Sequence, residues 1–185
     1  MAHDNARGDV LKGLVPTCKK CNGSFSADEE DFRNFAILAG SFTEAAEGVF
    51  KDEMLRSLKQ QAYGAKKLKR LMSRIEPQEE GSGIIHRIHL VESDFRVFRK
   101  IIRGLAYHHF KERFPAERVE ARQSPRIREE YLDTEVLSVI HPEVFRYKIV
   151  YPSMIEGQHS LWFLEFFRTV QIHGNVRRAE LVTCL

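Results

Sequence analysis

The chain has 185 residues, of which 43% are hydrophobic and 30% are charged. This length and composition can bury a core in one domain or two small ones, which argues against a disordered protein. The 29 basic and 26 acidic residues give a net charge of +3, which allows a nucleic-acid partner without requiring one. No apolar run reaches the roughly 18 residues of a spanning helix, and the polar start lacks a secretory signal. We therefore expect a cytoplasmic protein without a membrane partner.

The first distinctive feature is a close pair of cysteines. Residues 1–13 have no apolar periodicity and are predicted to form a loop. Cys18 and Cys21 follow in a C-x-x-C spacing, which can present two thiolates to one tetrahedral ion. Redox use is the alternative, but a redox pair opens a helix directly after a buried strand, and residues 22–24 intervene here. With three cysteines and no signal peptide, a disulfide framework is not expected, and Cys184 is predicted to be a free thiol.

Two helical regions are predicted next. Ser26 can open the first one through a Ser-x-x-Glu capping box, and Gly40 ends it. The second region is expected from about residue 43 to residue 75, with an interruption near Gly64 and a strongly basic C-terminal half. Residues 77–83 combine proline, glycine and polar side chains, which is typical of a linker between domains or of a long surface loop.

The remaining residues predict a sheet around one long helix. Residues 84–90 alternate as a short strand does, and an apolar stripe predicts a helix from Glu92 to about Phe114. The segments expected after it are a weak strand at 119–122, a short helix within 125–140, a strand at 144–151 and one or two aromatic-rich strands within 160–172. The expected fold class is α+β, with a helical middle and a C-terminal antiparallel β-sheet packed on a central helix.

Residues 15–32, VPTCKKCNGSFSADEEDF, resemble the second half of an HNH-type endonuclease module. This is the ββα-metal fold, in the version where a zinc knuckle of two C-x-x-C pairs braces the catalytic hairpin. The helix near residues 92–114 and the aromatic strands resemble, more loosely, the accessory region of some bacterial members. The resemblance implies a remnant of the ββα-metal module in residues 1–40, a helical region with a basic segment in 41–76, and an α+β accessory domain in 84–185.

The resemblance also implies roles for single residues. Cys18 and Cys21 would form half of a structural zinc site. Asn22 would orient the catalytic histidine, although an asparagine after such a pair also serves as a turn residue. Glu30 falls near the last metal ligand on the helix of the module. The general base would have to be His3, the only histidine before Cys18, and Mg²⁺ or Mn²⁺ would stabilise the charge on the phosphate.

The upstream half of the module is not visible in this chain. His3 lies in a polar, glycine-containing stretch without strand character, and no C-x-x-C pair precedes Cys18. We therefore expect an HNH endonuclease-like protein, by ancestry a DNA phosphodiesterase, whose chain is truncated or degenerate and has little or no nuclease activity. The alternatives are a non-catalytic module that binds nucleic acid or a protein, and a homodimer whose two cysteine pairs complete one Cys₄ zinc site.

Basic side chains suggest where a nucleic-acid backbone could bind. The candidates are Lys19 and Lys20 beside the cysteines, and Lys66, Lys67, Lys69, Arg70 and Arg74 on the second helical region. Such a cluster is more often the solvated face of an amphipathic helix. If the cluster does bind DNA, added salt should weaken the complex, because phosphate contacts release counterions.

Overall fold

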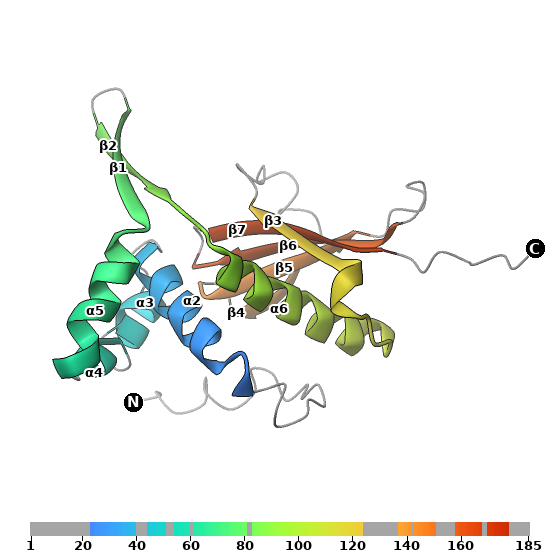
Figure 1. Ribbon diagram of the computed structural model, residues 1–185. Coiled ribbons are helices and arrows are strands. Elements are labelled where there is room, and N and C mark those ends of the chain that lie inside the picture. Colours follow the sequence, from blue (N-terminus) through green and yellow to red (C-terminus); the bar gives the residue numbers. More distant parts are fainter. Residues whose placement is uncertain are drawn as a thin grey trace, which may run out of the picture.

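The computed structural model describes residues 23–39, 44–50, 54–59, 61–80, 83–123, 137–141, 143–150, 158–167 and 170–177. In this part of the chain a five-stranded antiparallel sheet packs on the long helix α6 (Glu92–Phe110), with α2 (Ser26–Ala39) beside that helix (Figure 1). The protein is therefore of the α+β class. The predicted helical middle and the C-terminal antiparallel sheet on a central helix are confirmed.

The shorter helices follow α2 in the chain and gather at one end of the molecule (Figure 1). They are α3 (Glu44–Val49), α4 (Leu55–Leu58) and α5 (Gln61–Met72). The interruption predicted near Gly64 is wrong, because α5 continues through this residue, which is buried. A buried glycine weakens a helix without ending it when neighbouring elements pack against it.

The start of α2 differs from the predicted capping box. The Ser26 hydroxyl donates to the carbonyl of Gly23 at 2.9 Å, and the backbone N–H of Glu29 donates to the carbonyl of Phe25 at 2.9 Å. The Glu29 carboxylate pairs with Lys100 of α6. A cation on a neighbouring helix thus takes the place of the N-cap backbone N–H that the capping box would use.

A separate two-stranded hairpin extends away from the body between α5 and α6 (Figure 1). Its strands are β1 (Ile75–Glu80) and β2 (Gly83–Ile88), in an antiparallel register that pairs Ile75 with Ile88. The strand predicted at 84–90 is thereby confirmed. Residues 77–80 belong to β1 and Gly83 belongs to β2, so most of the predicted linker or loop is part of the hairpin. Pro77 is tolerated here because both strands of a two-stranded ribbon are edge strands, where a missing N–H is harmless.

The main sheet has the strand order β3-β7-β6-β5-β4 with all neighbours antiparallel. Its strands are β3 (Val119–Gln123), β4 (Leu137–His141), β5 (Phe145–Val150), β6 (Gln158–Phe166) and β7 (Val170–Arg177). The last four form an antiparallel meander; β5 and β6 lie where strands are predicted, and the aromatic-rich stretch 160–172 is divided between β6 and β7. Residues 137–140, expected within a short helix, belong to β4 because β5 supplies backbone partners for them; residues 124–136 lie outside the described part.

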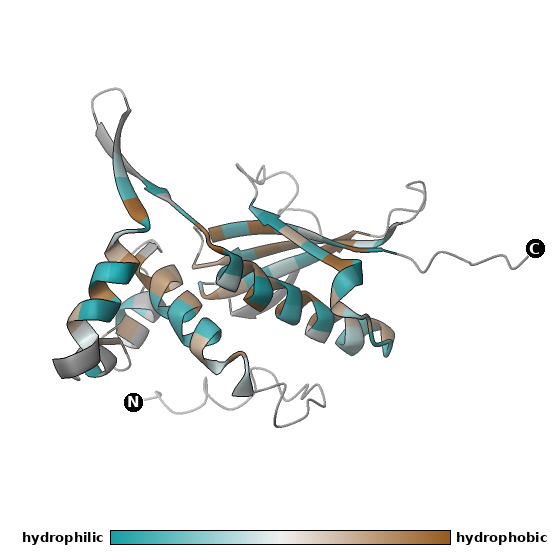
Figure 2. Cartoon of the chain, viewed as in Figure 1, coloured by the Kyte–Doolittle hydropathy of each residue, from teal (hydrophilic) through white to brown (hydrophobic). Residues whose placement is uncertain are grey.

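The core lies between the sheet and the two larger helices. Hydrophobic and polar residues alternate along the strands (Figure 2), so each strand turns one side toward α6. Phe32 of α2 meets Phe98 of α6 and Phe166 of β6, with ring centroids 4.8 and 5.0 Å apart. Residues from the predicted N-terminal module and from the predicted accessory domain thus share one core. The domain boundaries themselves stay a prediction.

The helix α6 packs directly on the backbone of β7. At Gly174 a Cβ atom would lie 2.4 Å from Cδ1 of Ile102 and 2.8 Å from the backbone oxygen of Glu120. Ile102 is fully buried. The glycine therefore permits the distance between helix and sheet, and every larger residue would push the two layers apart.

Candidate functional site

Most of the residues predicted to carry chemistry lie outside the described part of the chain. These residues are His3, Cys18, Lys19, Lys20, Cys21 and Asn22. The description begins at Gly23, directly after Asn22. The structure therefore describes the helix that follows the cysteine pair and the surface on which that helix is held.

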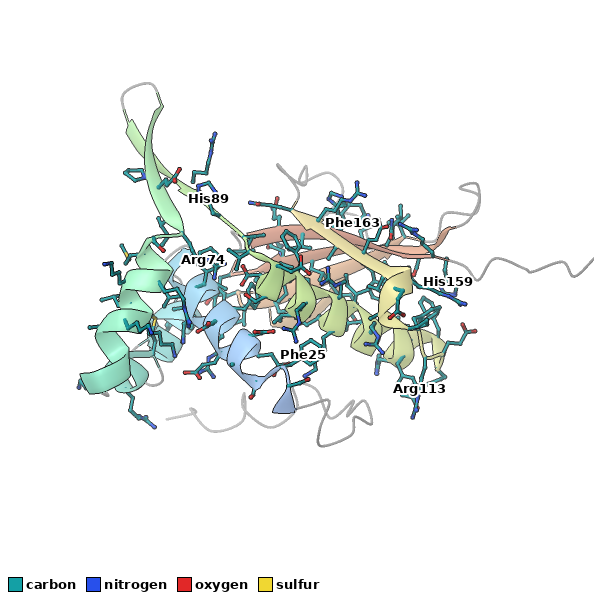
Figure 3. All side chains as sticks on the ribbon, viewed as in Figure 1. Phe25, Arg74, His89, Arg113, His159 and Phe163 are labelled. Carbon is teal, nitrogen blue, oxygen red and sulfur yellow. The ribbon has the colours of Figure 1, made fainter. Side chains whose placement is uncertain are left out.

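The first turn of α2 is attached to α6 by ion pairs and an aromatic ring. Asp28 pairs with Arg96 at 3.0 Å, and Glu29 pairs with Lys100 at 2.5 Å. The Phe25 ring lies 5.1 Å from the guanidinium carbon of Arg96 and 4.9 Å from Nζ of Lys100, within the range of cation–π attraction. We call these five residues the α2 clamp, and Figure 3 shows Phe25 at the start of the helix. The clamp fixes the first turn of α2, which follows the cysteine pair in the sequence.

The next two carboxylates of α2 face α5. Glu30, predicted to lie near a metal ligand, pairs with Lys67, and Asp31 pairs with Arg70 at 2.5 Å. Two of the cations predicted to follow a nucleic-acid backbone are thus occupied by the neighbouring helix. Lys66 and Lys69 are exposed. The basic segment of α5 therefore attaches this helix to α2 through Lys67 and Arg70, while Lys66 and Lys69 face solvent.

No described set of side chains forms a metal centre. Within residues 23–177, as far as the structure describes them, no group of three histidine, cysteine, aspartate or glutamate side chains is placed to hold a metal ion. The acidic residues 28–31 each face a cation of α5 or α6. A zinc site built on Cys18 and Cys21 would lie outside the described residues and stays a prediction.

Arg74, expected to belong to the basic surface cluster, is buried. Its guanidinium pairs with Asp94, its Nε donates to the carbonyl of His89 at 3.1 Å, and its Cζ lies 3.7 Å above the centre of the Phe35 ring. Figure 3 shows it where α5 meets the hairpin, near His89. The expectation is corrected for this residue: Arg74 joins α5 to α6 and cannot contact a nucleic acid.

The outer face of the main sheet, which points away from α6, carries a polar surface that sequence patterning did not identify. Arg146 donates to Glu165 through Nε at 2.8 Å, and Gln171 donates to the same carboxylate at 3.1 Å, so the contacts cross three strands. Glu120 pairs with both Arg122 and Arg177 at the other side of the sheet. The alternation of charged residues within each strand is the sequence signal for this face.

A concavity of about 320 Å³ lies at the β3 and β7 side of this outer face. It is lined by Glu120, Arg122, His173, Gly174, Asn175 and Arg177. Burial and the nearby charge of Arg122 lower the pKa of His173 below its ordinary value of 6.5, so its ring is neutral at pH 7. The concavity therefore combines two arginines, one carboxylate and a neutral imidazole.

No protein-family model, curated protein or solved structure matches this chain. Among the described helices, none has the length and apolar character needed to cross a membrane. Functional inference therefore depends on the residues of the chain and on their geometry.

Proposed function

We propose that this protein is a cytoplasmic HNH endonuclease-like protein, by ancestry a DNA phosphodiesterase and itself with little or no activity, in which residues 15–32 are the second half of a ββα-metal module. The observation that carries the proposal is the α2 clamp. A catalytic module needs its helix held in one position by surrounding contacts. Here Asp28, Glu29 and Phe25 hold the first turn of α2 directly behind the C-x-x-C-N segment.

In this proposal Cys18 and Cys21 contribute to a structural zinc site and Asn22 supports the catalytic hairpin. Zinc sites of this kind take four ligands, so a second copy of the chain is the proposed source of the other two thiolates. Glu30 is a poor metal ligand in this arrangement, because Lys67 already compensates its charge. His3, the only histidine before Cys18, lies in a polar, glycine-containing stretch without the strand pattern that the catalytic histidine of the module needs. We therefore expect little or no phosphodiester hydrolysis.

Metal content tests the cysteine pair. The purified chain and the C18S/C21S variant would be compared by elemental analysis and by size-exclusion chromatography with light scattering. We expect about one zinc ion per two chains and a dimer, with both lost in the variant. Zinc content equal in the two proteins, or absent from both, would remove the zinc knuckle from the proposal.

Plasmid DNA tests the chemistry. The chain would be incubated with supercoiled plasmid and Mg²⁺ or Mn²⁺, with and without EDTA, and the H3A variant would serve as the matched control. We expect a shift in mobility from binding and little nicking. Metal-dependent nicking that EDTA abolishes would overturn the expected inactivity, and nicking that H3A also abolishes would assign the general base.

A non-catalytic nucleic-acid-binding module is the second candidate. The basic outer face of the main sheet favours it, because the residues of this surface are far from the cysteine segment in the sequence. Under this alternative the chain binds nucleic acid normally in the C18S/C21S variant, whereas the first proposal predicts weaker binding.

A further inference from the structure

The outer face of the main sheet is free of the large helices. The elements packed against the sheet, α6 and α2, meet its inner face through residues such as Phe98 and Phe32. Figure 3 shows Phe163 on the opposite side, away from α6. Part of the Phe163 side chain is exposed to solvent. An aromatic ring that is partly exposed beside the polar residues of β7 calls for a reason beyond core packing.

The strand register places four residues in one row across the outer face. Phe163 of β6 pairs with Lys148 of β5 on one side and with His173 of β7 on the other, and His173 pairs with Arg122 of β3. Strands lie about 4.8 Å apart, so the row spans roughly 14 Å. We call Lys148, Phe163, His173 and Arg122 the cross-strand row. Two ring systems lie in the middle of the row; Arg122 at one end is exposed, whereas Lys148 at the other end is buried.

The charge of this face is positive. Its described cations that reach solvent are Arg122, Arg146 and Arg177, while Lys148 is buried, and the described carboxylates are Glu120 and Glu165. Glu165 is buried in its contacts with Arg146 and Gln171. At the open side the side chains of Arg122 and Arg177 are 72% and 53% exposed, and they share the single carboxylate of Glu120. Among the described residues, these two guanidinium groups thus face one carboxylate.

We propose that the outer face of the main sheet binds single-stranded nucleic acid, with a base stacked on Phe163 and backbone phosphates held by Arg122 and Arg177. This inference deepens the proposed function, because it names the form of the nucleic acid, and it rests on that function for the biological role. The residues that support this inference, on the outer face of the sheet, are different from the cysteine pair and the α2 clamp that support the proposed function. An antiparallel sheet with aromatic side chains on its open face is a general solution for stacking unpaired bases.

The chemistry of the surface separates this occupant from others. A base must be unstacked to lie flat on a sheet, so a duplex cannot use Phe163. The apolar residues Val150, Leu161 and Phe163 lie on the β5 and β6 part of this face, whereas the β3 and β7 part is lined by Glu120, Arg122, His173, Asn175 and Arg177, which is more charged than the core of a stable protein interface. The guanidinium groups offer paired donors that match phosphate oxygens, and the long contact of Arg122 with Glu120, at 3.4 Å, is easily exchanged for one.

Fluorescence anisotropy with a labelled oligothymidine of about 15 nucleotides tests the proposal, because this length is near the upper end of the sites, about 4–16 nucleotides, that OB-fold proteins use for single strands. We expect R122A/R177A to weaken binding about tenfold or more and to lower the slope of log affinity against log salt by about 1 to 1.5. We expect F163L to weaken binding at least about fivefold with an unchanged salt slope, because it keeps the apolar contact and removes only the ring.

A gain in affinity gives the sharper test. E120Q removes the carboxylate that competes for both arginines, and we expect it to tighten binding severalfold. R56A/K59A at α4 is the matched control for a general loss of positive charge, because both residues are exposed and belong to neither candidate surface, and it should leave the affinity unchanged. Thermal melting of each variant checks that it is folded. If F163L is unstable, R122A/R177A still tests the proposal, because both arginine side chains are exposed.

Several outcomes would overturn the inference. The first two are that R122A/R177A and F163L both bind the oligothymidine with wild-type affinity, and that E120Q binds it more weakly than the wild type. The other two are that the wild type binds the matching duplex as tightly as the single strand, and that the wild type binds neither. If the C18S/C21S variant loses binding while the outer-face variants keep it, the inference fails and the proposed function stands. If the outer-face variants lose binding in a protein without zinc, the inference stands and the proposed zinc knuckle fails.

Discussion

Arg74 and Asp94 form a buried ion pair that joins the end of α5 to the first turn of α6. The two side chains are 10% and 1% exposed. Asp94 also accepts the backbone N–H of Val91 at 2.8 Å, while Arg74 covers the ring of Phe35 in α2. Burial raises the pKa of Asp94, and the hydrogen bond from Val91 and the charge of Arg74 act against that rise. One ion pair thus connects α2, α5 and α6.

Removing one partner of this pair should be costly. We expect R74M to lower the free energy of unfolding by about 3–5 kcal/mol, because the Asp94 carboxylate would remain buried without its cation. Urea denaturation measures the loss. The double variant R74M/D94L should recover much of it, since neither charge is then left alone. The control R99A breaks the more exposed pair with Glu92 and should change stability by less than about 1 kcal/mol. A small effect of R74M would contradict the structural role assigned to the pair.

The burial of Arg74 also shows where sequence patterning fails. The helices α2 and α6 were predictable, because apolar residues recur on one face over many turns. Arg74 follows a run of lysines and arginines, so the local sequence pattern predicts that it is exposed like them. Its burial depends on Asp94, twenty residues further along the chain, and no local pattern contains that contact.

The strands were predictable to different degrees for the same reason. Alternation identified β5 and the aromatic strands, whereas β4 was assigned to a helix because its partner β5 is needed to define it. The cross-strand row exists only through the register of four strands, which brings Arg122 beside His173 and Lys148 beside Phe163. Candidate sites built from such pairings follow from tertiary structure, while a compact motif such as Cys18 and Cys21 is visible in the sequence alone.

The contact between Gly174 and Ile102 predicts a second stability effect. We expect G174A to lower the free energy of unfolding by about 1–3 kcal/mol, because the new methyl group would overlap Cδ1 of Ile102 and the backbone at Glu120. The variant I102V removes the overlapping atom, so G174A/I102V should cost less than the sum of the two single changes. Gly48, in α3, is the matched control: a Cβ there meets no atom within 4 Å, and G48A should be neutral or stabilising. Equal effects at the two glycines would exclude the close approach of α6.

Two histidines predict a loss of stability in mild acid. The pKa of His109 is lowered by burial and by the charges of His108 and Lys111, and that of His173 by burial and Arg122. An unfolded histidine takes up its proton as the pH falls through 6.5, whereas the folded ones do so only at lower pH. The folded state binds fewer protons in this window, so the stability is complete above pH 6.5 and is lost as the pH falls toward the folded pKa values.

The measurement is the midpoint of urea unfolding between about pH 7.5 and about pH 5.5. We expect the wild type to lose more stability over this interval than H109Q/H173Q, which cannot take up the two protons. Comparing the two proteins cancels the contribution of carboxylates such as Asp94. His109 also contacts the hydroxyl of Tyr147 at 2.9 Å, and glutamine can keep a hydrogen bond there. Identical pH profiles in the two proteins would show that these histidines titrate alike in both states.

Asn34 predicts a gain in stability. This residue of α2 is fully buried, and in the described structure neither the oxygen nor the nitrogen of its amide has a hydrogen-bond partner. An unpaired buried polar group costs about 1–3 kcal/mol. We therefore expect N34L, which keeps the number of heavy atoms and the branch point although its methyl groups are bulkier, to raise the free energy of unfolding by about 1–3 kcal/mol. A27L places the same side chain on the exposed face of α2 and should change stability by less than about 0.5 kcal/mol. A clear loss of stability in N34L would mean that the amide is paired in solution, as by a buried water that holds two to four such bonds.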